Sequence, residues 1–258
     1  MKVFILGGRG FVGSAFTRYC KKNRISHQVI HLQNYQDFVG KTCDLFINAN
    51  GNSKKYLAET DPRKDFELSV LSVEKTFKDF DFGKYVFCSS IDMYNDTANT
   101  ENNAEDAVID PARLSFYGFH KYLAEQLVRR YVSDWLIIRF GGFVGEGLKK
   151  NTIFDLLHGN PLWVDIRSRY QYLDTDSAAQ IVFNLIQMKK TKEIFNVCGN
   201  GTIAIEDAIK YLSGSFEIRY AHNSPSIEHY EINIDKLKSI IEVPETKETI
   251  ERYMSQQE

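Results

Sequence analysis

The sequence predicts an α/β fold, in which helices cover both faces of a parallel sheet and a small second lobe follows. Six apolar runs of strand length lie at residues 3–6, 28–32, 45–48, 85–89, 136–140 and 194–198, and helical patterns fill most of the intervals. Strands that alternate with helices indicate parallel β-α-β units, which place helices on both faces of the sheet. A glycine-rich turn directly after the first run also favours this class.

Each interval has its own helix signal. Phe11, Ala15, Phe16 and Tyr19 repeat at helical spacing, which predicts an amphipathic helix over residues 10–22. Further helices are expected over residues 61–79, where Pro62 suits the first turn, and over residues 111–131 and 177–188.

The regular alternation weakens after residue 141. A glycine-rich passage, a short helical pattern and an irregular stretch at 159–174 predict a second lobe, and the strand at 194–198 is expected to return to the sheet. We therefore expect a doubly wound domain from residues 1–144 and 174–200, and a small substrate-binding lobe from residues 145–173 and 201–258.

Composition limits the classes of partner. The 258 residues carry 32 Lys and Arg against 34 Asp and Glu, a net charge of −2, which argues against nucleic acid or a membrane surface as the partner. Apolar runs fall far short of the roughly 20 residues of a membrane helix. The opening lacks the pattern of a signal peptide, so a cytoplasmic protein is expected. The four cysteines are scattered as buried thiols would be, and we predict no metal site.

The glycine-rich turn at residues 7–13 follows the first strand and begins the first helix. It consists of Gly7, Gly8, Arg9, Gly10, Phe11, Val12 and Gly13. Glycines allow a tight turn and a close approach of the backbone to a pyrophosphate, and the N–H groups of the helix start stabilise that negative charge. The sequence therefore predicts a dinucleotide-binding turn and a Rossmann-type fold.

Two residues bear on the choice of cofactor. Gln33 falls near the end of the second strand, where an acidic residue often binds the adenine ribose of NAD, and it brings no carboxylate. Arg9 lies inside the turn, and its guanidinium matches the 2′-phosphate of NADP, although a solvated surface arginine explains it equally well. The sequence favours NADP slightly over NAD.

Tyr117 and Lys121 lie four residues apart and share one face of a predicted helix. The positive charge of the lysine is expected to lower the pKa of the phenol, so that Tyr117 can exchange a proton with a substrate hydroxyl or carbonyl. His120 lies between them in sequence but faces elsewhere, and we assign no role to any histidine.

Ser90 and Asp92 follow the strand at 85–89. Ligands of doubly wound sheets bind at the carboxyl ends of the strands. A serine hydroxyl there can hydrogen-bond the substrate oxygen that Tyr117 protonates. The sequence therefore predicts a Ser90, Tyr117 and Lys121 site.

These motifs together resemble the extended short-chain dehydrogenase/reductases, the group of nucleotide-sugar epimerases, dehydratases and reductases. The resemblance extends over most of the chain. It is carried by the glycine turn, Asp61-Pro62 with Ser69-Val70, Ser89-Ser90 with Tyr94, Tyr117-Gly118 with Lys121, Arg139 with Gly145, Arg169 with Asp176, Phe195-Asn196-Val197, and Asp235 with Pro244.

The resemblance implies NAD(P) and hydride transfer at a sugar carbon. It implies Tyr117 as acid and base, Lys121 as its electrostatic partner and a ligand of the nicotinamide ribose, and Ser90 as the hydrogen-bonding third member. Arg169 resembles a family arginine that grips the nucleotide pyrophosphate, a task for which a buried guanidinium is suited. Asp176 is interpreted as the cap of the helix at 177–188. A homodimer is common in the family.

The chain departs from the family pattern at two places. Ser69 stands where an asparagine is common. Ile91-Asp92 stands where dehydratases have an Asp-Glu pair, so a complete dehydratase set is missing. Asp92 either supports epimerisation beside a carbonyl or caps a turn, and we favour the cap.

The expected function is the reduction of a nucleotide-linked keto-deoxysugar. One alternative is a nucleotide-sugar epimerase with tightly bound NAD, and another is an isomerase or lyase acting on a non-nucleotide substrate. The alternative from a different class is a non-catalytic NAD(P)-binding sensor or assembly subunit, because fold does not fix function.

Overall fold

The central sheet of the computed structural model contains six strands, all paired in parallel. The structure describes residues 1–212 and 217–256. The strands lie in the order β2 (Ser26–Ile30), β1 (Lys2–Leu6), β3 (Thr42–Asn48), β4 (Asp81–Ser90), β5 (Trp135–Phe140) and β9 (Glu193–Val197). All six predicted strands are confirmed, and so is the Rossmann-type class. The second strand ends at Ile30, two residues before the predicted end, because a 3-10 turn, η1 (Leu32–Phe38), begins there.

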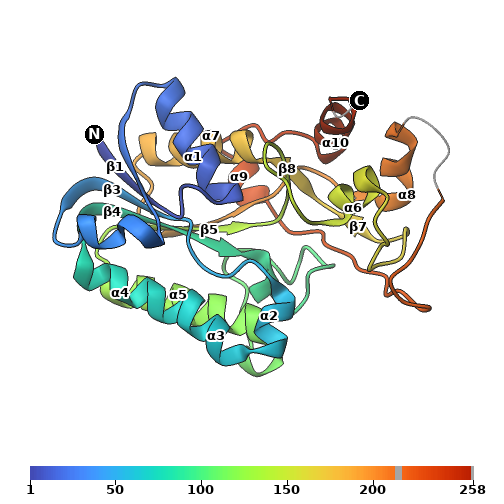
Figure 1. Cartoon of the computed structure of the whole chain (residues 1–258), viewed down its shortest axis with the longest axis horizontal. Helices are drawn as coiled ribbons and strands as arrows, with labels where there is room; N and C mark the ends of the chain where they lie inside the picture. The colour runs from blue at the N-terminus through green and yellow to red at the C-terminus, as the bar shows by residue number, and fades with distance from the viewer. Residues whose placement is uncertain (213–216, 257–258) are drawn as a thin grey trace.

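Helices cover both faces of the sheet (Figure 1). Val3 and Ile5 of β1 pack with α1 (Phe11–Lys22) and α7 (Thr175–Gln187), whereas Phe4 and Leu6 pack with α4 (Ser72–Asp79) and α5 (Phe116–Tyr131). Successive residues of a strand point to opposite faces, so one apolar run supplies both layers of the core.

Two predicted helices are interrupted. The helix expected over 61–79 is built from α3 (Pro62–Phe66), a π-helical turn η2 (Glu67–Leu71) and α4. The helix expected over 111–131 is a 3-10 turn, η4 (Pro111–Arg113), followed by α5. The prediction of one continuous helix over 111–131 is wrong because the hydroxyl of Ser115 accepts a hydrogen bond from Gly118 N at 3.2 Å and caps a new helix. A short helix, α2 (Lys55–Thr60), was not predicted.

The first turn of α7 also differs from the prediction. The helix begins at Thr175, and Asp174 caps it by accepting a hydrogen bond from Ser177 N at 2.8 Å. Asp176 therefore lies inside the helix, where its carboxylate pairs with Arg18 Nη2 of α1 at 2.7 Å. The interpretation of Asp176 as the cap is wrong because the helix starts two residues earlier than expected.

A third apolar cluster lies outside the sheet. It gathers side chains of β6 (Gly142–Val144), α6 (Thr152–His158), β8 (Tyr172–Asp174), β10 (Ile203–Ala204), α8 (Ile205–Ala208) and α10 (Thr246–Ser255). Strand β7 (Arg169–Tyr170) pairs with β10, and β6 pairs with β8. The division into a domain of 1–144 and 174–200 and a lobe of 145–173 and 201–258 stays a proposal, and residues 213–216 and 257–258 of that lobe lie outside the described residues.

Part of the C-terminal tail packs against the main sheet. Ile232, Ile234 and Leu237, the last in α9 (Asp235–Lys238), belong to the same buried cluster as Val197 of β9. The amide of Asn196 donates to the backbone carbonyls of Asn103 at 3.0 Å and of Asn233 at 2.9 Å. The main core is therefore completed by residues near the C-terminus.

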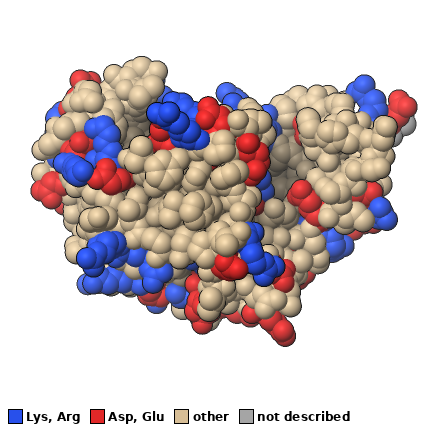
Figure 2. All heavy atoms as spheres, turned by 90° about the horizontal axis from the view of Figure 1, so that it is seen from below, with Lys and Arg blue, Asp and Glu red and all other residues tan. Residues whose placement is uncertain are grey.

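The molecular surface is hollowed between a larger and a smaller part on the face that Figure 2 shows. Lysines and arginines on this face are interspersed with acidic side chains. Among the described residues, no helix has both the length and the apolar character needed to cross a membrane.

Candidate active site

The glycine turn packs too tightly for side chains at two of its positions. Gly7 has a φ of +80°, and a Cβ atom there would lie 2.7 Å from the carbonyl oxygen of Ala49. A Cβ atom on Gly13 would lie 2.1 Å from the carbonyl oxygen of Gly7. The start of α1 has no side-chain cap and no acidic residue in its first turn. The turn therefore fits the pyrophosphate of a dinucleotide, because it leaves backbone N–H groups and close access for that anion.

We expect Gly13→Ala to weaken the binding of NADH and NADPH at least about tenfold, a change of about 1.4 kcal/mol. The added methyl group must displace the Gly7 carbonyl, and such overpacking also costs about 1–3 kcal/mol of stability. Fluorescence titration measures the affinity, and Ser14→Ala in the same helix turn is the control. Unchanged affinity in a folded Gly13→Ala protein would contradict the assignment of this turn.

Arg9 and Gln33, the two residues that bear on the choice of cofactor, lie in the segments that follow β1 and β2. Arg9 is exposed, and Gln33 lies in η1 with its side-chain oxygen 2.8 Å from Nδ1 of His31. Both lie beyond the carboxyl ends of β1 and β2.

Ser90, Tyr117 and Lys121 lie close together, as the sequence predicted. Ser90 is the last residue of β4, and the other two lie on α5. All three are buried, with 6–8% of each residue exposed, and the ammonium of Lys121 lies 5.7 Å from the ring centre of Tyr117. A Cβ atom on Gly118 would lie 2.3 Å from the carbonyl oxygen of Asp92, so this glycine lets α5 approach the end of β4.

The pKa of Tyr117 is raised. Burial is the largest cause, the negative charge of Asp92 adds to it, and Lys55 and Ser90 act in the opposite direction. Burial also lowers the pKa of Lys121. The expectation that Lys121 lowers the pKa of the phenol overall is wrong in this structure, because desolvation of the phenolate is the stronger effect.

The carboxylate of Asp92 is surrounded by donors. Its Oδ2 accepts a hydrogen bond from Ser90 Oγ at 3.0 Å. Its Oδ1 lies 2.6 Å from Lys55 Nζ and accepts from the hydroxyl of Tyr230 at 3.1 Å. The turn η3 (Ile91–Met93) is capped by Ser90 Oγ, which accepts from Asp92 N at 3.2 Å. The favoured interpretation of Asp92 as a cap is therefore wrong, since Ser90 provides the cap.

Lys55 and Tyr230 are site residues that the sequence did not indicate. Lys55 belongs to one of several dispersed lysine pairs, which the sequence presents as solvated surface, and Tyr230 lies in the C-terminal tail. Neither has a local motif. Only the fold places them next to Asp92.

A second cluster of buried polar side chains connects α5 to the segments around α2 and α3. His120 Nδ1 lies 2.6 Å from Asp65 Oδ2, and Asp65 Oδ1 accepts hydrogen bonds from Ser69 Oγ at 3.0 Å and from Asn52 Nδ2 at 2.8 Å. These residues come from α5, α3, η2 and the loop before α2. They hold this loop beside Lys121, where a Cβ atom on Gly51 would lie 3.4 Å from the lysine Nζ.

The sequence model of the NAD dependent epimerase/dehydratase family matches residues 3–198. The chain belongs to this family. The resemblance to extended short-chain dehydrogenase/reductases of the nucleotide-sugar group is thereby confirmed. No curated protein matches the sequence.

Solved structures of similar fold cover the epimerase/dehydratase chain almost completely. UDP-glucuronic acid 4-epimerase from Bacillus cereus, in complex with UDP-glucuronic acid and NAD, has a TM-score of 0.80 at 16% identity, with 99% of each chain covered. Pal from Bacillus thuringiensis has a TM-score of 0.76 at 19% identity over 100% of both chains. dTDP-4-dehydrorhamnose reductase from Bacillus anthracis, in complex with NADP, has a TM-score of 0.77 at 13% identity, covering 99% of this chain and 98% of that one. These likenesses show the fold.

Several other motif residues of this epimerase/dehydratase-family protein meet in a buried network around Arg139. Arg139 donates from Nε and Nη2 to the two carboxylate oxygens of Glu125, at 3.1 and 2.9 Å. Its Nη1 donates to the hydroxyl of Tyr94 at 2.7 Å, and that hydroxyl donates to Asn196 Oδ1 at 2.7 Å. The network joins α5, β5 and β9, so these residues support the site from inside the sheet.

Arg169 lies in β7 and is exposed, with its Nε donating to Thr202 Oγ1 at 3.1 Å. The guanidinium is exposed because β7 and β10 form only a two-stranded ribbon at this position. The carbonyl of Arg169 accepts a hydrogen bond from Tyr230 N at 2.9 Å, which connects this strand to the residue that contacts Asp92. Its assignment to the pyrophosphate stays a proposal.

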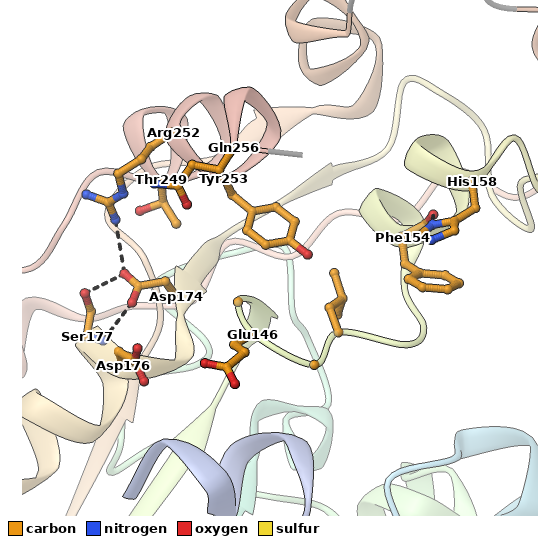
Figure 3. A pocket seen from close by; sticks show the side chains of 13 residues that line it. Glu146, Phe154, His158, Asp174, Asp176, Ser177, Thr249, Arg252, Tyr253 and Gln256 are labelled. Carbon is orange, nitrogen blue, oxygen red and sulfur yellow. Dashed lines mark hydrogen bonds and ion pairs between the residues drawn. The ribbon is translucent and has the colours of Figure 1, made fainter. Parts of the chain in front are cut away.

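A hollow of about 760 Å³ lies beside α10 and the start of α7 (Figure 3). Asp174, which points into this region, accepts from Ser177 and pairs with Arg252 Nη2 at 3.2 Å. Ser90, Tyr117 and Lys121 are not among the lining residues. We therefore place the candidate active site at Ser90 and Tyr117 and not in this hollow.

Proposed function

We propose that the protein transfers hydride between a nicotinamide cofactor and a carbonyl or alcohol carbon of a nucleotide-linked sugar. The observation that carries this proposal is the convergence of Ser90, Tyr117 and Lys121 at the carboxyl end of β4, on the same edge of the sheet as the glycine turn. Ligands bind at this edge in doubly wound sheets. Reduction of a keto-sugar with NADPH is the direction we favour, because Gln33 offers no carboxylate to the ribose of NAD.

The cofactor would be held by the glycine turn and by Lys121, and it supplies the hydride when bound. In the reductive direction Tyr117 donates its proton to the substrate oxygen, and Lys121 stabilises the resulting phenolate. Ser90 stabilises the negative charge that develops on that oxygen.

Ser90 has a single hydroxyl proton, which it donates to Asp92 in the structure. To donate to the substrate oxygen, the hydroxyl must rotate away from Asp92. Lys55 and Tyr230 continue to compensate the carboxylate after this rotation, since both contact its other oxygen. Asp92 thus sets the resting orientation of Ser90.

A nucleotide-sugar epimerase that retains NAD is the second candidate. The observation that favours it is the carboxylate of Asp92 next to Ser90, because a carboxylate beside the reacting carbonyl can act as a base that takes a proton from the neighbouring carbon and returns it to the opposite face.

One experiment separates the candidates. One sample of the purified protein is denatured with acid, and any released nucleotide is identified by mass. A second, folded sample is titrated with NADPH and NADH by fluorescence. We expect an empty site that prefers NADPH, with the preference lost in Arg9→Ala and kept in Arg63→Ala. Tightly retained NAD would favour the epimerase, and the absence of any nucleotide binding would contradict both candidates.

A further inference from the structure

Three lysines gather where two loops meet beside the candidate active site. Lys54 and Lys55 follow β3 and begin α2, whereas Lys150 lies between β6 and α6. The ammonium of Lys150 donates to the backbone carbonyl of Ser53 and lies 3.3 Å from its hydroxyl. The segment before α2 and the segment before α6 are thereby joined.

The positive charge of this lysine cluster (Lys54, Lys55 and Lys150) is only partly compensated. Lys55 pairs with Asp92 at 2.6 Å. Within residues 1–212 and 217–256, no ion pair with a carboxylate is formed by Lys54 or Lys150. Partial desolvation lowers the pKa of Lys150, and the charges of Lys54 and Lys55 lower it further. The cluster thus carries three positive charges, of which only that of Lys55 is paired with a carboxylate, and an added anion would relieve the repulsion among them.

The position of the cluster indicates which part of a ligand it would meet. Lys55 contacts Asp92, and Asp92 accepts a hydrogen bond from Ser90. Lys55 is therefore connected through Asp92 to the hydroxyl of Ser90, which in the proposed function donates a hydrogen bond to the reacting oxygen of the substrate.

We propose that Lys54, Lys55 and Lys150 form a binding site for an anionic group of the substrate. This inference rests on the proposed function and narrows its substrate class to sugars with negative charge near the reacting carbon. A carboxylate on the reacting sugar is the source that the position favours, and the diphosphate of the nucleotide is the other source of the same chemistry.

The test compares two ligands that differ at the sugar carboxylate, UDP-glucuronic acid and UDP-glucose, by isothermal titration calorimetry. The variants are Lys54→Met with Lys150→Met, which remove the unpaired charges and leave the Lys55 to Asp92 pair intact. Lys149→Met, an exposed lysine next to Lys150, is the matched control. We expect the natural protein to bind UDP-glucuronic acid about tenfold more tightly than UDP-glucose, and the double variant to lose this preference.

Each other outcome has a distinct meaning. Equal weakening of both ligands in the double variant would support the anion site and assign it to the diphosphate. Unchanged affinities in the double variant would overturn the anion site while leaving the proposed function intact. Weakened NADPH binding with unchanged sugar-nucleotide binding would overturn it as well, since the cluster would then serve the cofactor. Binding of NADPH without binding of either sugar nucleotide would contradict both this site and the nucleotide-sugar part of the proposed function.

Discussion

Tyr117→Phe is expected to lower the kcat of hydride transfer by about 10²–10⁴-fold, the usual contribution of a positioned acid or base. The ring stays in place and keeps its packing, but the proton donor to the substrate oxygen is gone. Affinity for the nicotinamide cofactor is expected to change little. Stopped-flow absorbance of the reduced nicotinamide measures the loss, with the sugar nucleotide that the natural protein turns over.

Tyr122→Phe is the matched control, because Tyr122 follows Lys121 on the same helix and its substitution removes a phenol hydroxyl while leaving Tyr117 unchanged. A loss of less than tenfold in Tyr117→Phe would remove Tyr117 from the mechanism. Cofactor binding without turnover by the natural protein would favour a non-catalytic nucleotide-binding subunit.

The raised pKa of Tyr117 adds a pH dependence to this prediction. A phenol whose pKa lies above its usual value remains protonated at neutral pH, which suits a proton donor. The reductive kcat is therefore expected to be independent of pH around neutrality. The oxidative kcat, which needs the phenolate, is expected to rise with pH.

Glu125→Gln is expected to destabilise the protein by about 3–5 kcal/mol, the usual effect of removing one partner of a buried ion pair. The side chains of Arg139 and Glu125 are 4% and 0% exposed, so the arginine charge would remain in the core without its carboxylate. Urea denaturation followed by circular dichroism measures the change in the free energy of unfolding.

Glu74→Gln provides the comparison. Glu74 pairs with Lys78 at 2.6 Å, but the two side chains are 35% and 76% exposed, and such a pair on a helix surface contributes about 0.5 kcal/mol or less. Comparable losses in the two variants would show that burial does not decide the strength of the Arg139 to Glu125 pair.

The order and type of the elements of the main sheet were predictable because the information is local. Each central strand is an apolar run, and Gly7 to Gly13 mark the first β-α turn. The site trio was predictable for the same reason, since Tyr117 and Lys121 share a helix face and Ser90 follows a strand. Helix starts were less predictable, because Ser115 and Asp174 act as caps only through the conformation of a single turn.

The parts that sequence reasoning missed depend on contacts between distant segments. Lys55 and Tyr230 reach Asp92 from α2 and from the C-terminal tail, and neither carries a local signal. The sign of the pKa shift of Tyr117 was also not predictable, because it depends on how far the ring is buried. The spacing of residues in the sequence indicates which side chains come together, whereas the burial of a side chain in the fold determines the direction of its pKa shift.

The packing of the C-terminal tail against β9 has a consequence for synthesis of the chain. All six strands of the sheet are synthesised before residues 232–237, yet Ile232, Ile234 and Leu237 belong to the core beside β9. Until they arrive, that edge is uncovered and the amide of Asn196 lacks its Asn233 partner. The apolar surface beside β9 therefore stays exposed until this segment is made, so its docking follows the formation of the sheet.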